Sequence, residues 1–317
     1  MSFSAATSDA LAASDVKVVI TGARGWIGRA AVSMLETVFS DEICERVVLF
    51  GAKQNLLPLR SGSTISVRPL SEIVELRGNA FLFVHLAFLT REHIHSYGVQ
   101  EYVKANNLIS TLALDFASRV RPSGLFVSSS GAIYDEDGLP EEDLDKNPYG
   151  FLKRQDEIKF SELDMDRSKK ALIRIFNLSG PFLNKPNGYV LGSILRDLAK
   201  GHVVKIDSDY EVVRSYIHVR DVLEIAFSIM LGLIPSPGVP FDTAGEEVVE
   251  IGELAQLAIQ VLGASSVTIH RPEMDTNKAM DYYVGDGRVL LELARMQQLE
   301  LASLAEQIRD TADYLRG

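Results

Sequence analysis

The stretch TGARGWIG, residues 21–28, decides the fold. It follows the apolar run VKVVI and precedes IGRAAVSMLETVF, whose apolar residues recur at helical spacing. Strand, glycine turn and helix in this order let backbone N–H groups and a helix N-terminus receive a phosphate. We therefore predict that Gly22 permits a tight turn, Gly25 lets the backbone approach a pyrophosphate, and Gly28 lets the helix pack closely on the strand.

The rest of the chain alternates apolar runs with helical patterns. Strands are predicted at 46–50, 81–87, 124–130 and 171–178, and helices at 96–119, 149–163, 189–201, 220–232, 252–263 and 288–316. This alternation predicts an α/β fold: a doubly wound parallel sheet, the Rossmann fold, over residues 15–180. Residues 181–317 are expected to form a smaller C-terminal α/β lobe with some segments returning to the first domain, and residues 1–14 a flexible tail.

Composition excludes several classes of function. The 317 residues carry a net charge of −11, so a basic surface that follows nucleic acid or anionic membrane is not expected. The only cysteine, Cys44, leaves no internal disulfide and no multi-cysteine metal site, and no metal site is expected from the other residues. The sequence shows no secretory signal and no apolar stretch of membrane-spanning length, so a cytoplasmic protein is expected.

The pattern T-G-x-x-G-x-x-G resembles the fingerprint of the short-chain dehydrogenase/reductase superfamily. Further motifs extend the resemblance to its extended branch, the NAD(P)-dependent nucleotide-sugar epimerases, dehydratases and ketoreductases. They follow in order along nearly the whole chain: HLA at 85–87, NNLIST at 106–111, SSSGAIY at 128–134, PYGFLK at 148–153, RIFNLSGP at 174–181, RSYIHVRDV at 214–222 and FDTAGEEVVEIGELA at 241–255.

Tyr149 and Lys153 stand four residues apart, so a helix presents both side chains on one face. Taken alone, such a pair is more often an ordinary helix pair. The resemblance implies that Tyr149 is the general acid/base, that Lys153 lowers its pKa and contacts the nicotinamide ribose, and that Ser130 binds and orients the substrate. It also implies that Asn107 supports the active site, although a helix-packing role beside Asn106 stays open.

The resemblance implies a nicotinamide cofactor, held by Gly22, Gly25, Trp26, Ile27, Gly28, Lys53, Leu86, Ala87, Tyr149 and Lys153. NAD-preferring members end the second strand with an Asp, whereas here the strand runs into Gly51, Ala52 and Lys53. Lys53 can accommodate a 2′-phosphate, so NADP is preferred modestly over NAD; an ordinary surface charge is the alternative. Arg68 and Pro69 replace the usual Asp-hydrophobe pair at the adenine end.

Arg214 and Arg271 resemble the family's diphosphate-binding arginines, and Asn177 its substrate-contacting asparagine, which together imply a nucleotide diphosphate sugar as substrate. Gly131–Ile133 offers no carboxylate pair for dehydration, so hydride transfer at one carbon, expected at C4, is favoured. A 4-epimerase and a 4-ketoreductase are favoured about equally. The alternatives are an NADPH-dependent reductase of a non-nucleotide carbonyl compound and a non-catalytic cofactor-sensing protein.

Two further expectations concern assembly and the histidines. The helices expected at 96–119 and 149–163 are those that form a four-helix dimer interface in similar proteins, so the resemblance implies a homodimer. His85 and His218 have no ligand-spaced His, Asp or Glu near them and are expected to be buried packing residues.

Overall fold

The run VKVVI forms β1, Lys17–Thr21, near the centre of an eight-stranded sheet. Val18, Val19 and Ile20 are fully buried, as expected of a strand covered on both faces. The computed structural model describes residues 1–78, 80–201 and 203–316. These divide into two units: the first comprises Met1–Ile175 with Leu223–Phe241, and the second comprises Phe176–Val222 and the chain from Asp242 onward.

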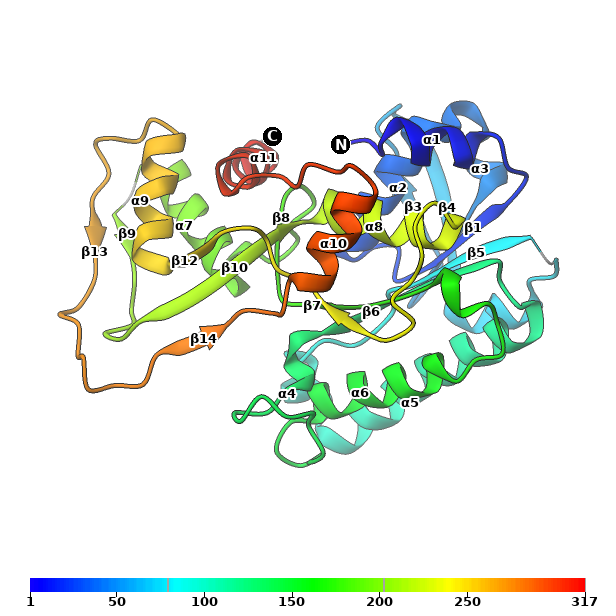
Figure 1. Ribbon diagram of the computed structural model, residues 1–317, viewed down its shortest axis with the longest axis horizontal. Helices are drawn as coiled ribbons and strands as arrows, with labels where there is room; N and C mark the ends of the chain where they lie inside the picture. Colours follow the sequence, from blue (N-terminus) through cyan, green and yellow to red (C-terminus); the bar gives the residue numbers. More distant parts are fainter. Residues whose placement is uncertain (79, 202, 317) are drawn as a thin grey trace. The chain divides into compact units, whose positions relative to one another are not determined.

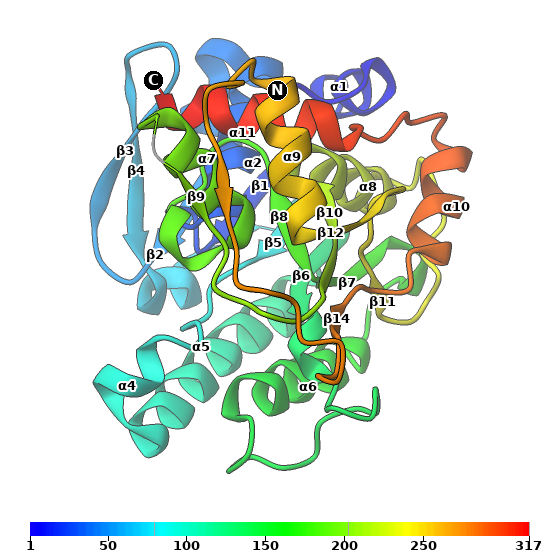
Figure 2. The same cartoon turned by 90° about the vertical axis from the view of Figure 1, so that its left-hand side faces the viewer.

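The sheet has the order β11-β7-β6-β5-β1-β2-β4-β3 (Figures 1 and 2). Its other strands are β2 Val47–Gly51, β3 Asn55–Pro58, β4 Thr64–Pro69, β5 Phe81–His85, β6 Gly124–Ser130, β7 Lys170–Ile175 and β11 Phe241–Asp242. From β7 to β4 every neighbouring pair is parallel, whereas β3 joins the edge antiparallel to β4. The predicted doubly wound parallel α/β sheet is therefore confirmed.

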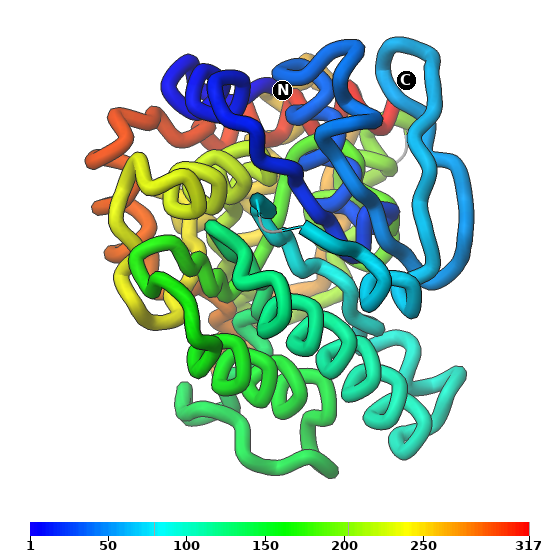
Figure 3. The backbone as a smooth tube through the Cα atoms, turned by 90° about the vertical axis from the view of Figure 1, so that its right-hand side faces the viewer, coloured from blue at the N-terminus to red at the C-terminus, as the bar shows by residue number. Residues whose placement is uncertain are grey.

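This sheet is covered by helices α2 Trp26–Phe39, α3 Ile43–Arg46, α5 Val99–Val120, α6 Pro148–Ser161 and α8 Val219–Leu231, and the short helix α4 His93–Tyr97 packs against α5. Helices α5 and α6 run side by side, as two views agree (Figures 1 and 3). Phe83 of β5, Phe116 of α5 and Phe160 of α6 are fully buried, and the rings of Phe83 and Phe116 meet edge to face at 4.9 Å. Aromatic packing thus fixes these two helices on the sheet.

The N-terminal residues differ from the flexible tail expected over residues 1–14. Ala5–Ala12 forms α1, which packs on α2. The buried carboxylate of Glu224 accepts hydrogen bonds from the Ser4 backbone N–H at 2.9 Å, the Ser4 hydroxyl at 2.7 Å and the Thr7 hydroxyl at 2.6 Å. Leu11 is fully buried. A buried acid that needs donors and an apolar residue that leaves water hold this segment in place.

The second unit contains short strands and four helices among its described residues. The strands are β8 Asn177–Ser179, β9 Val204–Lys205, β10 Val212–His218, β12 Val248–Glu250, β13 Ile269–His270 and β14 Asp281–Tyr283, and the helices are α7 Val190–Ala199, α9 Ile251–Val261, α10 Arg288–Met296 and α11 Leu304–Arg316. Strand β10 is central, antiparallel to β12 and parallel to β14 and β8.

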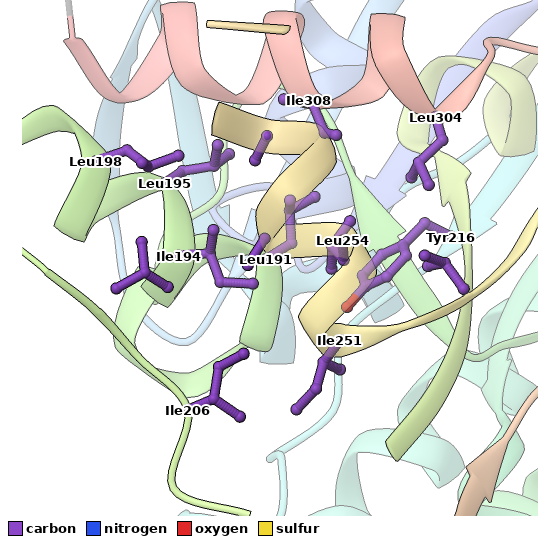
Figure 4. Close-up of a cluster of buried hydrophobic side chains, with 14 of the residues drawn as sticks. Leu191, Ile194, Leu195, Leu198, Ile206, Tyr216, Ile251, Leu254, Leu304 and Ile308 are labelled. Carbon is purple, nitrogen blue, oxygen red and sulfur yellow. The ribbon is translucent and has the colours of Figure 1, made fainter. Parts of the chain in front are cut away.

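Three helices of this unit, α7, α9 and α11, enclose its apolar core (Figures 2 and 4). Leu191 and Leu195 of α7, Leu254 of α9 and Ile308 of α11 are all buried there. The helical spacing of these apolar positions predicts such one-sided burial. The core supports β10, on which one of the predicted substrate residues lies.

Two predicted elements are divided in the structure. The apolar run expected as one strand at 171–178 forms β7 and then β8, with Phe176 between them. β7 pairs with β6, whereas β8 pairs with β10. The helix expected at 288–316 is interrupted between Met296 and Leu304, where Gln298 has φ +54°. The β3–β4 hairpin was not predicted as a hairpin.

Candidate active site

The glycine turn lies against the end of β5. Gly22 has φ +74°, and its N–H donates to the carbonyl of Phe50 at 3.0 Å. A Cβ at Gly22 would lie 2.7 Å from the backbone nitrogen of Ala87 and from the carbonyl carbon of Leu86. Only glycine fits both the backbone conformation and this approach. The structure thus brings together three residues predicted to contact the cofactor, Gly22, Leu86 and Ala87.

The same turn leads into the N-terminus of α2. Gly25 occupies the N-cap position, where no side chain caps the helix, and Trp26 and Ile27 begin its first turn. A Cβ at Gly28 would lie 2.5 Å from the carbonyl oxygen of Gly22, so the helix and the turn are in contact. A helix of this length with its first turn uncapped by a side chain favours an anion at that end. The turn therefore fits a pyrophosphate.

The end of β2 carries no carboxylate and is crowded by the neighbouring strand. A Cβ at Gly51 would lie 3.0 Å from Cγ1 of Val67 on β4, so the neighbouring strand leaves little space for a side chain. Lys53 follows as an exposed residue. The guanidinium carbon of Arg68 lies 5.4 Å from the centre of the Phe50 ring. Arg68 also forms ion pairs with Glu72 and Glu75. The charge of Arg68 is thus balanced by acids, whereas no partner is described for Lys53.

Ser130, Tyr149 and Lys153 come together at the carboxyl end of β6. Ser130 is the last residue of β6, and Tyr149 and Lys153 lie one turn apart at the start of α6. Asn147 caps α6 by accepting from the Gly150 N–H at 3.0 Å, and its amide nitrogen donates to the carbonyl of Ala132 at 2.9 Å. This cap ties the helix to the turn that follows Ser130.

The side chain of Ser130 lies near enough to the Tyr149 hydroxyl to favour its charged form. Burial raises the pKa of Tyr149, and this effect exceeds the opposing influence of Ser130 and of the Arg91 charge. The lowering of this pKa by Lys153, which the resemblance implies, stays a prediction, because the net direction reflects burial and does not test the effect of the ammonium.

The ammonium of Lys153 is buried beside these groups. Its Nζ donates to the carbonyl of Ser128 at 2.8 Å and lies 4.0 Å from the centre of the Phe88 ring. Burial lowers the pKa of Lys153 to about 8, against the opposing charges of Asp156 and Glu157. Lys153 is thus a cation at neutral pH that loses its proton at a lower pH than an exposed lysine.

Two buried polar contacts behind the site were not predicted. Glu157 binds Arg174 of β7 through two contacts of 2.9 Å, and Asp156 accepts from the Ser110 hydroxyl of α5 at 2.6 Å. Together they join α6 to its neighbouring strand and helix. The sequence spacing could have indicated Glu157, because this residue stands one helical turn after Lys153 and on the same face of the helix.

The two adjacent asparagines of α5 differ in environment. Asn107, the predicted residue, is exposed on α5. Asn106 is buried, and its side chain bonds both backbone groups of Leu89, accepting from the N–H at 2.8 Å and donating to the carbonyl at 3.3 Å. Helical rotation explains the difference, since adjacent residues point about 100° apart and only one can face the loop after β5.

In the second unit, Arg214 and Asn177 both contact protein groups. The guanidinium of Arg214 binds the carboxylate of Asp281 through contacts of 2.7 and 3.1 Å. The side-chain nitrogen of Asn177 donates to the carbonyls of Ser215 and Tyr283. Arg214 lines a cavity of about 340 Å³ within this unit, together with Asp281 and the exposed Lys205. The volume lies in the range of small-ligand sites.

Arg271, the second predicted arginine, has a different environment. Its guanidinium contacts the carboxylate of Glu250 at 2.9 Å and the carbonyls of Ser208 and Tyr210 at 3.0 and 2.8 Å. It is not among the residues lining the cavity of Arg214. These contacts hold the loop around Ser208, and they favour a structural role for Arg271.

Both histidines singled out in the sequence are buried. Nδ1 of His85 lies 2.8 Å from the Thr21 hydroxyl, and Nδ1 of His218 accepts from the Arg220 N–H at 3.0 Å. Burial lowers the pKa of each to about 3, so both are neutral at physiological pH. Nε2 of His218 lies 3.3 Å from the carboxylate of Asp310. Because the imidazole is neutral, this contact is not an ion pair.

Over residues 1–78, 80–201 and 203–316, no group of three or more His, Cys, Asp or Glu is arranged to hold a metal ion. Within the same ranges, no helix has both the length and the apolar character needed to cross a membrane.

Comparison with known proteins identifies a family whose sequences match this chain. The sequence model of the NAD dependent epimerase/dehydratase family matches residues 18–231, more than half of the chain. UDP-glucuronic acid decarboxylase 6 of Arabidopsis thaliana is 25% identical over 236 residues, covering 69% of this chain and 67% of that protein. dTDP-4-dehydro-6-deoxy-D-allose reductase of Streptomyces bikiniensis is 31% identical over 154 residues, covering 46% of this chain and less than half, 43%, of that protein.

Several solved structures share the fold. UDP-N-acetylglucosamine 4-epimerase from Methanobrevibacter ruminantium, in complex with UDP-N-acetylmuramic acid, has a TM-score of 0.72 at 17% identity, with 95% of this chain and 98% of that chain covered. UDP-glucuronic acid 4-epimerase from Bacillus cereus, in complex with NAD, has a TM-score of 0.67 at 16% identity, with 95% and 96% covered. At these identities the likeness shows the Rossmann-type fold of nucleotide-sugar epimerases.

Proposed function

Since the chain belongs to the NAD dependent epimerase/dehydratase family, we propose that it transfers hydride between a nicotinamide cofactor and one carbon of a nucleotide diphosphate sugar. The observation that carries this proposal is the cluster of Ser130, Tyr149 and Lys153 at the end of β6. The glycine turn stands at the end of β1, two strands away in the same parallel sheet. Carboxyl ends of parallel strands share one edge, where such sheets bind ligands.

The residues divide the work of proton transfer. When bound, the nicotinamide supplies or accepts the hydride. Tyr149 donates a proton to the carbonyl oxygen during reduction and accepts one from the hydroxyl during oxidation, and Ser130 holds that oxygen by a hydrogen bond. Lys153 contributes a nearby positive charge that stabilises the phenolate. Because burial raises its pKa, Tyr149 rests as the protonated phenol, which is the form that reduction of a ketone requires.

We place the reacting carbon at C4 and do not assign a dehydration. The Gly131–Ile133 turn directly after Ser130 carries no carboxylate, and elimination of water needs an acid/base pair beside the sugar. A 4-epimerase and a 4-ketoreductase need the same Ser130, Tyr149 and Lys153. They differ in whether the cofactor remains bound or exchanges, which an experiment can decide.

For the cofactor, NADP is preferred modestly over NAD. Gly51 leaves no carboxylate to receive the adenosine ribose hydroxyls, and Lys53 provides an exposed positive charge two residues later. Arg68 contributes less, because Glu72 and Glu75 pair with it. The Bacillus cereus epimerase of the same fold holds NAD, so NAD remains the second candidate.

For the substrate, the cavity of Arg214 is the proposed place of the nucleotide diphosphate. Arg214 and Lys205 offer two cations, and a planar guanidinium suits bidentate phosphate contact. The carboxylate of Asp281 now occupies that fork, so a diphosphate must replace it. Asn177 stays a proposed substrate contact through its side-chain oxygen, whereas Arg271 is proposed to support the loop.

We also propose a cytoplasmic homodimer, on the resemblance of the α5 and α6 pair to the dimer helices of similar proteins. Exposed apolar side chains on these helices support the proposal, since Leu108 is 60% and Ile158 43% exposed. Light scattering at micromolar concentration tests it. A mass twice that of the 34.9 kDa chain is expected, and a monomer would contradict the proposal.

The experiment that tests the function identifies the cofactor released from purified protein and then screens nucleotide sugars by thermal shift. We expect a nicotinamide dinucleotide and at least one stabilising nucleoside diphosphate sugar that is turned over. Tightly retained oxidised cofactor would assign an epimerase, and freely exchanged NADPH a reductase. Turnover of simple ketones without any nucleotide affinity would favour the non-nucleotide carbonyl reductase instead.

A further inference from the structure

Phe88 contacts two residues of the proposed catalytic cluster. Its ring centre lies 4.0 Å from the Lys153 ammonium nitrogen and 5.6 Å from the ring centre of Tyr149, which it meets edge to face at 81°. Phe88 follows the motif HLA directly, and its side chain is half-buried. Neither the glycine turn nor the Ser130, Tyr149 and Lys153 cluster accounts for an aromatic ring at this position.

The backbone beside this ring is held at both of its polar groups. Leu89 donates its N–H to the side-chain oxygen of Asn106 at 2.8 Å. Its carbonyl accepts from the Asn106 amide at 3.3 Å and from the Tyr102 hydroxyl at 2.7 Å. Asn106 and Tyr102 are both buried on α5. Helix α5 therefore fixes the loop after β5, and with it the position from which Phe88 reaches Lys153.

The Phe88 ring lies beside the buried Lys153 ammonium, which has lost its contacts with water. Lys153 has three N–H donors, and one described partner, the carbonyl of Ser128 at 2.8 Å, accepts from it. The face of an aromatic ring carries partial negative charge and attracts a cation, most strongly when water is excluded. Since Lys153 is only 6% exposed, the ring offsets part of the cost of removing the charge from water.

Other charged and titratable groups also surround Lys153. Asp156 and Glu157, on its own helix, favour the charged form, although the Glu157 carboxylate is shared with Arg174 of β7. His85 of β5 is neutral, because burial and the charge of Lys153 lower its pKa to about 3. The phenol of Tyr149 is protonated, since burial raises its pKa. Phe88 is thus an uncharged contact that acts directly on the ammonium through its π face.

We propose that Phe88 is a positioning residue, whose ring holds the Lys153 ammonium at the end of β6 beside Tyr149 and favours its charged form. Asn106 is proposed to act through Phe88 by fixing Leu89. The effect on Lys153 is a property of the folded protein, and only its consequence for turnover rests on the proposed function.

The direct test is a titration of Lys153 by NMR on protein with isotope-labelled lysine side chains, assigned with Lys153→Met. In Phe88→Leu, which keeps an apolar side chain without the ring, the pKa of Lys153 should fall by about 1, a roughly tenfold weaker proton affinity. Phe88→Tyr keeps the ring and should restore the wild-type value. An unchanged titration in Phe88→Leu would overturn the proposal.

A second pair of variants keeps the test valid if Phe88→Leu does not fold. Asn106→Ala should lower the pKa of Lys153 in the same direction and by a smaller amount, whereas Asn107→Ala, one residue away on the exposed side, should leave it unchanged. Equal titrations in both variants would contradict the link through Leu89. Wild-type titration in Phe88→Leu combined with tighter cofactor retention would also overturn the proposal, since the ring would then be an obstruction.

Turnover separates this inference from the proposed function. Activity that needs a charged Lys153 declines as the pH rises through its pKa, so the alkaline limb of kcat/KM in Phe88→Leu should move down by as much as the NMR titration moves. If the titration shifts and no nucleotide sugar is turned over by any variant, the proposed function fails and the inference about Phe88 stands.

Discussion

The two units treat their predicted functional residues in opposite ways. In the first, the residues converge on one another: Gly22 packs against Leu86 and Ala87, and Ser130 lies beside Tyr149. In the second, the predicted arginines face carboxylates of the same unit, Arg214 with Asp281 and Arg271 with Glu250. The groups proposed for chemistry are thus already assembled, whereas the cations proposed for recognition are occupied by internal ion pairs that a ligand has to replace.

The largest effect should come from the first unit. Tyr149→Phe removes the proton donor and acceptor while keeping the ring, so we expect turnover to fall by about 10²–10⁴-fold. Cofactor retention should change little. Tyr97→Phe, at a tyrosine that is half exposed, serves as the control and should keep full activity. An unchanged turnover rate in Tyr149→Phe would instead favour the hypothesis of a non-catalytic, cofactor-sensing protein.

The role of the glycine turn can be tested with a closely matched pair of variants. Gly22 and Gly138 both have φ +74°, but a Cβ at Gly138 meets nothing within 4 Å, whereas one at Gly22 meets backbone atoms at 2.7 Å. Both alanine variants should lose about 1–2 kcal/mol of stability through the left-handed conformation. Gly22→Ala should lose more and should also bind the cofactor weakly. Thermal unfolding and cofactor titration measure the two effects, and equal losses would show that crowding at the turn has no role.

The ion pairs of the second unit give a smaller and more specific effect. Arg214→Met should raise the KM for a nucleotide sugar by about 10- to 100-fold, since a charge-assisted contact contributes about 1.5–3 kcal/mol. Asp281→Asn frees the guanidinium and should tighten nucleotide binding. Arg271→Met should lower the melting temperature and leave the KM near its original value. The reverse outcome, with Arg271 controlling the KM, would return the diphosphate role to Arg271.

Lys53 should have the smallest effect. Its ammonium is exposed, and exposed ion pairs contribute about 0–1 kcal/mol. Lys53→Gln should therefore reduce the preference for NADP over NAD by about two- to fivefold. Kinetics with both cofactors measure this ratio, with Lys104→Gln, another exposed lysine, as the control. A ratio that does not change would identify Lys53 as an ordinary surface charge.

The order of the elements could be predicted from the sequence because apolar runs and helical spacing are local properties. Which sheet a run joins is not local. The predicted strand at 171–178 is divided at Phe176 because β7 pairs with β6 and β8 with β10, a choice set by residues far along the chain. The ordering of Ala5–Ala12 likewise depends on Glu224, more than two hundred residues later.

At the candidate site, the predicted residues share motifs with fixed spacing, whereas the missed ones depend on orientation. Asn106 and Asn107 are identical in type and adjacent, and only the rotation of α5 decides that Asn106 reaches Leu89. Phe88 carries no motif of its own, so its contact with Lys153 emerges only when β5 and α6 are placed in space. Residue type and spacing thus predict the groups proposed to react, and packing determines which residues contact them.

The most direct test of hydride transfer at this site is the near-ultraviolet absorbance of reduced nicotinamide during a single turnover. Protein loaded with one nicotinamide cofactor is mixed with the nucleoside diphosphate sugar that stabilises it best. We expect the reduced-cofactor signal to form or disappear at a rate at least equal to turnover, and this change to be nearly absent in Tyr149→Phe. Product formation with no change in this signal, or the same signal in Tyr149→Phe, would contradict hydride transfer assisted by Tyr149.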